Sequence, residues 1–245
     1  MKRKRYFWLI AVWLCLFCFS SYGAAGQALA DADGSETPAP YLEILQKANS
    51  MILNGADDAE SVEDGYYALS ELGFYLTQAE LLDQVGYSVQ DLSGDGTPEL
   101  ILGEIIRSDM PGPDSNLIYA LYTLDADQRA RLVFEGWYRN AYRYAGDGRF
   151  MYLGAGGAAS SMFGMCGLSR DGKDLIWSDY YFTIPREGNY EIIDYYYNTS
   201  GKSETQGSQR LDISEDAFWQ ISDRLQDEAT TTRSEERRVG KECRS

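Results

Sequence analysis

The sequence predicts an α+β fold with N-terminal helices, a long antiparallel β-sheet meander and a C-terminal helix. Three observations support this class. Apolar residues recur at helical spacing between residues 41 and 84, Tyr, Ile, Val and Phe become dense from Tyr87 onward with Gly, Asp and Asn between them, and a helical pattern returns after residue 213. No period of 20–50 residues repeats, so a propeller or a solenoid is not supported.

Three helices are expected before the sheet. The first has one apolar face, formed by Leu42, Leu45, Ala48 and Ile52. Asn54-Gly55 is a typical C-terminal stop for that helix. A second helix is expected over residues 61–72 and a third over residues 77–84.

Nine strands are expected in the meander. They are placed at residues 86–91, 98–106, 117–124, 130–138, 141–145, 149–154, 160–168, 174–184 and 189–197. Tight turns are indicated at residues 125–127, 146–148 and 171–172, where Asp and Gly tolerate the left-handed conformation. Residues 198–209 are polar and predict a loop.

The last predicted helix covers residues 214–228. Ser214 is its expected N-cap, and Glu215 and Asp216 in the first turn favour the positive end of the helix dipole. Its buried stripe is expected to consist of Phe218, Ile221 and Leu225.

Residues 1–30 have the layout of a secretory signal peptide. Basic residues at positions 2–5 precede an apolar run from Tyr6 to about Phe19, and Ala28-Leu29-Ala30 predicts cleavage before Asp31. An uncleaved membrane anchor is the less favoured alternative, because the strongly apolar part is short. We therefore expect a secreted, extracellular protein with no membrane insertion after cleavage, a linker at residues 31–40 and a single α+β domain at residues 41–232.

Residues 233–245 resemble the in-frame translation of a common sequencing adapter, and all thirteen residues match. We interpret this segment as a non-native tail. The alternative is a native basic arm on an acidic protein.

The composition excludes several classes of function. The chain has a formal net charge of −16, no His and four Cys. Without the leader and the tail, residues 31–232 contain 13 basic and 35 acidic residues, a net charge of −22, and Cys166 as their single cysteine. Such acidity would repel phosphate and disfavours nucleic-acid binding. One cysteine cannot form a disulfide framework, and without His no Ser-His-Asp triad or His-ligated zinc site can form.

One motif carries metal-binding chemistry, Asp-Leu-Ser-Gly-Asp-Gly-Thr-Pro-Glu over residues 91–99. The expected ligands are the side chains of Asp91, Ser93, Asp95 and Glu99 at positions 1, 3, 5 and 9, and the backbone carbonyl of Thr97 at position 7. Gly96 stands at position 6, where a loop around a cation turns sharply. Calcium takes about six to eight hard oxygen ligands, so the motif predicts a calcium ion. The alternative is an ordinary Asp-Gly turn without metal.

This loop resembles an EF-hand loop up to its ninth position. It then departs from that pattern, because Leu102 stands where the bidentate glutamate would be and both flanks are predicted strands. It is more similar to the loops between strands in FG-GAP and integrin-type repeats, although those occur in several copies. Glu104 or Asp109 is a candidate for the missing ligand.

A wider resemblance covers residues 40–228. The string DLSGDGTPELILG from Asp91, with LIYALY from Leu117 and VFEGW from Val133, is similar to uncharacterised secreted proteins of Gram-positive gut bacteria. The resemblance implies a location at the Gram-positive cell surface and brings no known activity with it.

These features predict a secreted or cell-wall-associated, non-enzymatic calcium-binding domain with a structural ion; no catalytic residue is identified. The alternative is a glycan-binding or glycan-hydrolysing protein that uses acidic and tyrosine residues on the sheet, with a cell-wall or glycan partner. Tyrosines cluster at residues 180–181 and 195–197, but neighbouring strand residues face opposite ways and Tyr favours half-buried strands, so sheet packing is the favoured interpretation. A groove with two carboxylates beside exposed tyrosines would favour the alternative.

Overall fold

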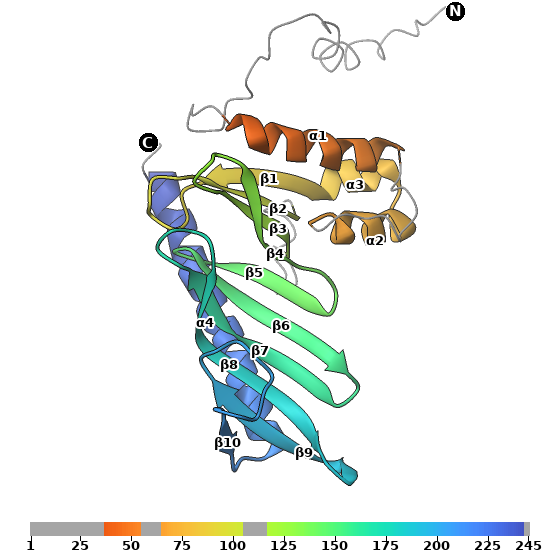
Figure 1. The fold of residues 1–245 in the computed structure, drawn as a ribbon, viewed down its shortest axis with the longest axis vertical. Coiled ribbons are helices and arrows are strands. Elements are labelled where there is room, and N and C mark those ends of the chain that lie inside the picture. Colours follow the sequence, from red (N-terminus) through yellow and green to blue (C-terminus); the bar gives the residue numbers. More distant parts are fainter. Residues whose placement is uncertain (1–36, 55–64, 105–116, 243–245) are drawn as a thin grey trace, which may run out of the picture.

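The computed structural model describes residues 37–54, 65–104 and 117–242 and confirms the α+β class (Figure 1). In chain order the elements are α1 (Ala39–Asn54), α2 (Tyr67–Tyr75), α3 (Gln78–Gln84), β1 (Val85–Gln90), β2 (Glu99–Glu104), β3 (Leu117–Leu124), β4 (Ala130–Glu135), β5 (Asn140–Gly146), β6 (Arg149–Gly157), β7 (Ser160–Leu168), β8 (Leu175–Arg186), β9 (Asn189–Asn198), β10 (Gln209–Leu211) and α4 (Glu215–Glu242). The predicted signal peptide and residues 31–36 of the predicted linker lie outside these ranges.

The described strands form one antiparallel sheet in the order β1-β2-β3-β5-β6-β7-β8-β9-β10, with β4 paired to β3 alone. Both β4 and β5 pair with β3: Ile118 lies opposite Tyr142 of β5, and Leu121 lies opposite Phe134 of β4. The short segment between β4 and β5 therefore lies between two pairings with the same strand. The Gly136 amide still donates to the Tyr119 carbonyl, which ties the start of this segment to β3.

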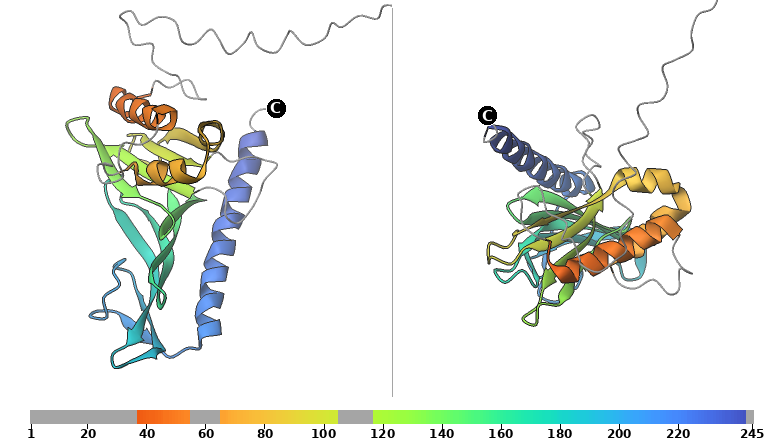
Figure 2. Two further views of the ribbon diagram at one scale, coloured as in Figure 1. Left: turned by 90° about the vertical axis from the view of Figure 1, so that its right-hand side faces the viewer. Right: turned by 90° about the horizontal axis from the view of Figure 1, so that it is seen from above.

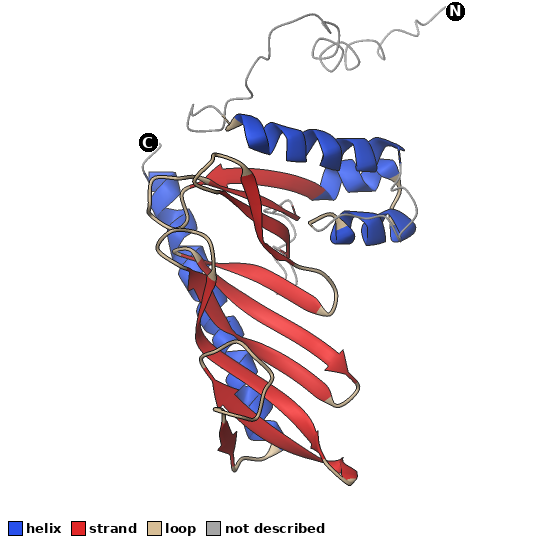
Figure 3. Cartoon of the chain, in the orientation of Figure 1, coloured by secondary structure: helices blue, strands red, loops and turns tan. Residues whose placement is uncertain are grey.

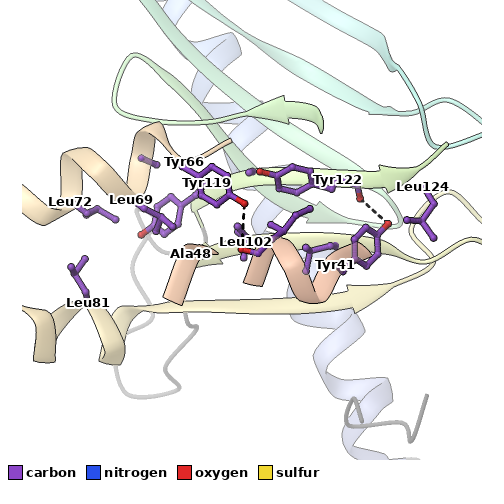
Figure 4. Packing of buried hydrophobic residues seen from close by; sticks show 14 residues of the cluster. Tyr41, Ala48, Tyr66, Leu69, Leu72, Leu81, Leu102, Tyr119, Tyr122 and Leu124 are labelled. Atoms are coloured by element: carbon purple, nitrogen blue, oxygen red, sulfur yellow. Dashed lines mark hydrogen bonds between the residues drawn. The ribbon is translucent and has the colours of Figure 1, made fainter. Parts of the chain in front are cut away.

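The three N-terminal helices cover β1–β3 and enclose the first core (Figure 4). This helical core contains Tyr41, Leu69, Leu81, Leu100 and Leu102, among other residues. The apolar face predicted for the first helix is confirmed only in part: Ala48 is buried, and Leu45 and Ile52 pack against the core at partly buried positions. Leu42 is not a member of this core, and α1 instead buries Tyr41 and Ile44 together with Ala48. Apolar burial of this kind stabilises a domain by roughly 25 cal/mol per Å² removed from water.

A second core is formed almost entirely by side chains of the sheet. Phe134 stacks on Tyr142 with ring centroids 4.1 Å apart, and Tyr152 meets the edge of Trp177 at 5.3 Å. Cys166 is buried in this aromatic core, and burial raises the pKa of its thiol to about 12. The thiol therefore stays protonated and packs as a small apolar group.

The C-terminal helix covers the face of the sheet opposite to the aromatic core. Figure 2 shows it running along this face. Phe218 is fully buried, with its ring centroid 4.8 Å from those of Phe163 and Tyr195, and Leu225 is also buried. Ile221 packs beside them, so the predicted stripe is confirmed. The Ser214 hydroxyl accepts from the Ala217 amide at 3.2 Å, as expected of an N-cap.

Several boundaries differ from the predictions. The helix α1 begins at Ala39, so the predicted linker ends two residues early, and Pro40 lies in the first turn, where an amide donor is not needed. Within the described residues, the second helix begins at Tyr67 rather than at residue 61 and ends at Tyr75. Residues 209–211 form the strand β10, which the sequence pattern does not predict and which overlaps the predicted loop 198–209 at Gln209, because a three-residue strand has too short a pattern to recognise.

The helix α4 continues beyond the predicted end at Glu228. Its backbone remains helical through Glu242, and so includes most of the adapter-like segment 233–245. The prediction ended the helix where its apolar stripe ends, whereas the backbone continues through polar residues. Among the described residues, no helix combines the length and the apolar character needed to cross a membrane.

An ion-pair network joins β8, β9 and β10. Asp194 accepts two hydrogen bonds from Arg186, at 2.6 and 3.1 Å, and a third from Arg210 at 2.7 Å. The hydrogen bonds from Arg186, followed by the one from Arg210, lower the pKa of the Asp194 carboxyl to about 2. The network therefore holds the short strand β10 to the sheet through a carboxylate that stays ionised at mildly acidic pH.

We expect Asp194→Asn to destabilise the protein at pH 6, and we expect this loss to shrink as the pH falls from about 4 to about 2. Because the folded-state pKa is lowered, the ionised carboxylate stabilises the folded state above its unfolded pKa and stops doing so once it is protonated. Urea unfolding of both proteins across this pH range measures the effect. A difference that stays constant down to pH 2 would contradict the assignment.

Candidate metal centre

The predicted metal-binding loop joins β1 to β2, and its flanks Gln90 and Glu99 pair directly. Gly94 and Gly96 adopt φ values of +75° and +90°, in the left-handed region that favours glycine. The chain therefore turns sharply at Gly96, the position at which the motif requires a turn.

Backbone amides of the loop hold the two aspartates. The Asp91 carboxylate accepts from the amides of Gly94 at 2.7 Å and Gly96 at 2.9 Å. The Asp95 carboxylate accepts from the Thr97 amide at 2.6 Å. Both carboxylates are exposed to solvent. The loop thus orients two negative charges before any cation arrives.

Glu99 is the exceptional member of the set, because its side chain is 0% exposed. One carboxylate oxygen, Oε2, accepts from the amides of Leu92 at 2.7 Å and Ser93 at 3.2 Å. The other, Oε1, has no hydrogen-bond partner among the described residues, and neither has the nearby hydroxyl of Thr123. Burial raises the pKa of Glu99, the amides of Leu92 and Ser93 oppose that rise, and the charge of Asp91 adds to it.

The three carboxylates converge. Asp91, Asp95 and Glu99 each offer one oxygen atom, and these three atoms lie within 4.8 Å of one another. Two oxygens bound to one calcium ion at about 2.3–2.6 Å are at most about 5 Å apart, so the cluster matches the span of a single cation. The arrangement can hold a metal ion that enters from the solvent side, where both aspartates are exposed.

The other predicted ligands take different places. The Ser93 hydroxyl lies 3.4 Å from Asp91 Oδ1, beside the cluster, and Thr97 contributes its amide to Asp95. Glu104, suggested as an additional ligand, lies at the far end of β2 opposite Val85. It lies five positions along the strand from Glu99, roughly 16 Å away, so it cannot complete the same site. Asp109 lies outside the described residues.

Residues far away in the sequence form the walls of the site. Tyr41 on α1 donates its hydroxyl to the Pro98 carbonyl at 2.7 Å, and it also lies 3.4 Å from the Tyr122 carbonyl (Figure 4). A Cβ atom at Gly148 would lie 2.3 Å from the Leu92 carbonyl, and one at Gly172 would lie 2.5 Å from Glu99 Oε1. The turns β5–β6 and β7–β8 therefore approach the loop so closely that a side chain at either glycine would require a neighbouring atom to move.

The sheet tyrosines suggested for a glycan surface are mostly engaged in the cores. Tyr180 is buried in the aromatic core, Tyr195 packs on Phe218, and Tyr196 stacks on Phe182 with centroids 5.2 Å apart. Tyr195 and Tyr196 thus face opposite sides of the sheet, as strand alternation predicts. These contacts support the sheet-packing interpretation of the two clusters.

Comparisons of the chain with protein-family models, with curated proteins and with solved structures find no match. The interpretation of the site therefore depends on the geometry of its residues.

We expect Gly172→Ala to destabilise the protein more than Gly188→Ala. Both glycines have positive φ, +68° and +80°, so each substitution costs about 1–2 kcal/mol in backbone strain. Only at Gly172 does the new Cβ meet Glu99, which adds about 1–3 kcal/mol of overpacking, because the site at Gly188 is open. Urea unfolding of the two variants measures the difference, and equal losses would show that the β7–β8 turn does not press on Glu99.

Proposed function

We propose that this protein is a secreted or cell-wall-associated calcium-binding domain, non-enzymatic, in which the ion is structural. The observation that carries the proposal is the fully buried Glu99 carboxylate, with one oxygen unpartnered among the described residues and two further carboxylates within 4.8 Å. A buried, incompletely paired charge is costly, and a cation bound at the cluster would neutralise it.

The chemistry of the donor set favours calcium. The cluster offers carboxylate oxygens, with the Ser93 hydroxyl close by. Hard oxygen donors select calcium or magnesium over zinc or copper, which prefer nitrogen and sulfur. Magnesium demands near-ideal octahedral geometry at about 2.0–2.1 Å, whereas calcium accepts irregular sites of more ligands. An extracellular location would supply calcium at the concentration that weak sites need, with Kd about 10⁻⁴–10⁻³ M.

The position of the cluster favours a structural role for the ion. The loop is joined to α1 through the Tyr41–Pro98 hydrogen bond and contacts the β7–β8 turn through Gly172. A cation at Glu99 would therefore act on the helices, the first hairpin and the later strands together. At a ten-fold excess of calcium over Kd, binding would stabilise the fold by about 1.4 kcal/mol.

The strong negative charge of residues 31–232 supports an extracellular partner that is neither nucleic acid nor an anionic membrane. A cell-wall or glycan partner is compatible with this charge when the ligand is uncharged. The resemblance of the loop region to secreted proteins of Gram-positive gut bacteria supports the same location.

Calcium is expected to raise the melting temperature of the purified protein relative to excess chelator. A gain of about 1.4 kcal/mol at ten-fold excess corresponds to roughly 3–6 °C. Asp95→Asn should lose most of this shift, because the amide keeps the hydrogen bond from Thr97 but removes a charge from the cluster. Magnesium at equal concentration should shift the melting temperature less.

Asp127→Asn is the matched control, since it removes one exposed aspartate from another hairpin loop, between β3 and β4. It should keep the full calcium shift. If wild-type protein melts at the same temperature with calcium and with chelator, the proposal is wrong. A shift that Asp127→Asn abolishes as fully as Asp95→Asn would indicate general screening of the acidic surface instead.

The stability of Glu99→Gln relative to wild type should depend on whether calcium is present. Without metal the variant should be more stable than wild type by about 1 kcal/mol, because it removes a buried charge while its carbonyl still accepts from Leu92. With calcium the variant should gain little, since a ligand charge is lost. Glu104→Gln, at the other end of β2, serves as control, and a metal-free Glu99→Gln protein less stable than wild type would contradict this account of Glu99.

A further inference from the structure

A second concave site lies away from the metal cluster, between α2 and the segment that joins β4 to β5. It has a volume of about 690 Å³. Its lining consists of Tyr67, Glu71, Tyr75, Glu135, Trp137, Tyr138, Arg139 and Asn140. Figure 3 shows the joining loop below α2, and Figure 1 shows it on the other side of the molecule from the β1–β2 loop. We call this site the aromatic cleft.

One wall of the aromatic cleft is a face of α2. Tyr67, Glu71 and Tyr75 are spaced four residues apart, so they follow one another along a single side of the helix. Tyr75 is 77% exposed. A tyrosine this exposed contributes little to the core, and so its ring is free to contact a ligand.

The facing wall is the segment that joins β4 to β5, residues 136–139, with the strand ends Glu135 and Asn140. The amides and carbonyls of Trp137 and Asn140 bond reciprocally, at 2.9 and 2.6 Å, and so close a tight turn. Tyr138 at its tip is 83% exposed. Of the large hydrophobic side chains in the described residues, Tyr138 and Tyr75 are the two most exposed, and both line the same cleft.

Hydrogen bonds hold the two walls in a fixed relation. The Tyr67 amide at the start of α2 donates to Glu135 Oε1 at 2.6 Å, and the Asn140 side chain donates to the Glu135 carbonyl at 2.8 Å. Trp137 is anchored from behind by the edge of Tyr119, with centroids 6.2 Å apart. The cleft is therefore preformed, which reduces the ordering cost of binding.

We propose that the aromatic cleft binds a neutral oligosaccharide. Sugar rings present an apolar C–H face that lies against aromatic rings, and a rim of hydroxyls that both donate and accept hydrogen bonds. The cleft offers four aromatic residues for the faces, carboxylates of Glu71 and Glu135 as acceptors, and Arg139 and Asn140 as donors. Pockets of a few hundred Å³ with aromatic walls and a few polar groups are typical of small-ligand sites.

Two other ligand classes fit less well. A proline-rich peptide also docks on aromatic grooves, but proline lacks an amide hydrogen and offers few donors to the acceptor-only carboxylates of Glu71 and Glu135. An anionic sugar or phosphate would be repelled by the carboxylates of Glu71 and Glu135. Among the described lining residues, only the guanidinium of Arg139 would attract it. The net charge of −22 on residues 31–232 would repel it further.

The test is calorimetric titration of the purified protein with neutral hexasaccharides of β-1,4-linked glucose, xylose, mannose and N-acetylglucosamine and of α-1,4-linked glucose. Hexagalacturonic acid and a proline-rich decapeptide are titrated in parallel. At least one neutral hexasaccharide should bind one to one with Kd below about 10⁻³ M. Tyr138→Ala and Tyr75→Ala should each weaken binding about ten-fold, and neither should unfold the protein, because both side chains are exposed.

Phe74→Ala is the matched control, since Phe74 is an exposed aromatic residue of α2 that does not line the cleft. It should bind as wild type does. Excess chelator should leave the binding unchanged, which separates this proposal from the calcium proposal. Failure of all the neutral hexasaccharides, equal binding by Tyr138→Ala, or binding of the uronate or the peptide alone would each overturn the inference.

Discussion

The arrangement of the candidate metal centre depends on one constraint, the burial of the Glu99 carboxylate at the first residue of β2. Its Oε2 atom is bonded to the loop amides of Leu92 and Ser93, while Oε1 faces Thr123 and the backbone of Gly172. A charged group in such a place must be neutralised by a proton or by a cation. The loop around it supplies the carboxylates of Asp91 and Asp95. Repulsion among these carboxylates disfavours an ionised Glu99 without a cation, whereas a bound divalent ion would be attracted by all three.

The rest of the fold explains why this carboxylate is buried at all. The N-terminal helices cover β1–β3, and Tyr41 ties α1 to the last residue of the loop before β2. The β7–β8 turn, which comes later in the sequence, also contacts the site, because its Gly172 lies against Glu99. Leu92 of the loop also packs against the aromatic core. Glu99 therefore lies where the helical core, the aromatic core and a distant hairpin meet.

Much of this architecture could be predicted from local patterns. Alternating apolar residues and Asp-Gly turns place most strands within a few residues, and the stripe Phe218, Ile221 and Leu225 identifies the face of α4 that packs on the sheet. The loop motif locates Asp91, Asp95 and Glu99. The pattern could not indicate that Tyr41, Gly148 and Gly172 form the walls of the site, because these contacts join residues about 50–80 positions apart in the chain. The sequence pattern also predicts one strand over residues 130–138, whereas β4 ends at Glu135 and the segment that joins it to β5 forms one wall of the aromatic cleft.

The most direct measurement of the central claim is a calcium titration followed by ¹H–¹⁵N NMR on the metal-free protein. The amides of Leu92, Ser93, Gly94 and Gly96 donate to Glu99 and Asp91, so they report any ion at the cluster. A structural calcium site predicts that these signals move together and saturate as one binding event with Kd about 10⁻⁴–10⁻³ M. Signals that do not move, or small shifts spread over all the acidic loops without saturation, would contradict it.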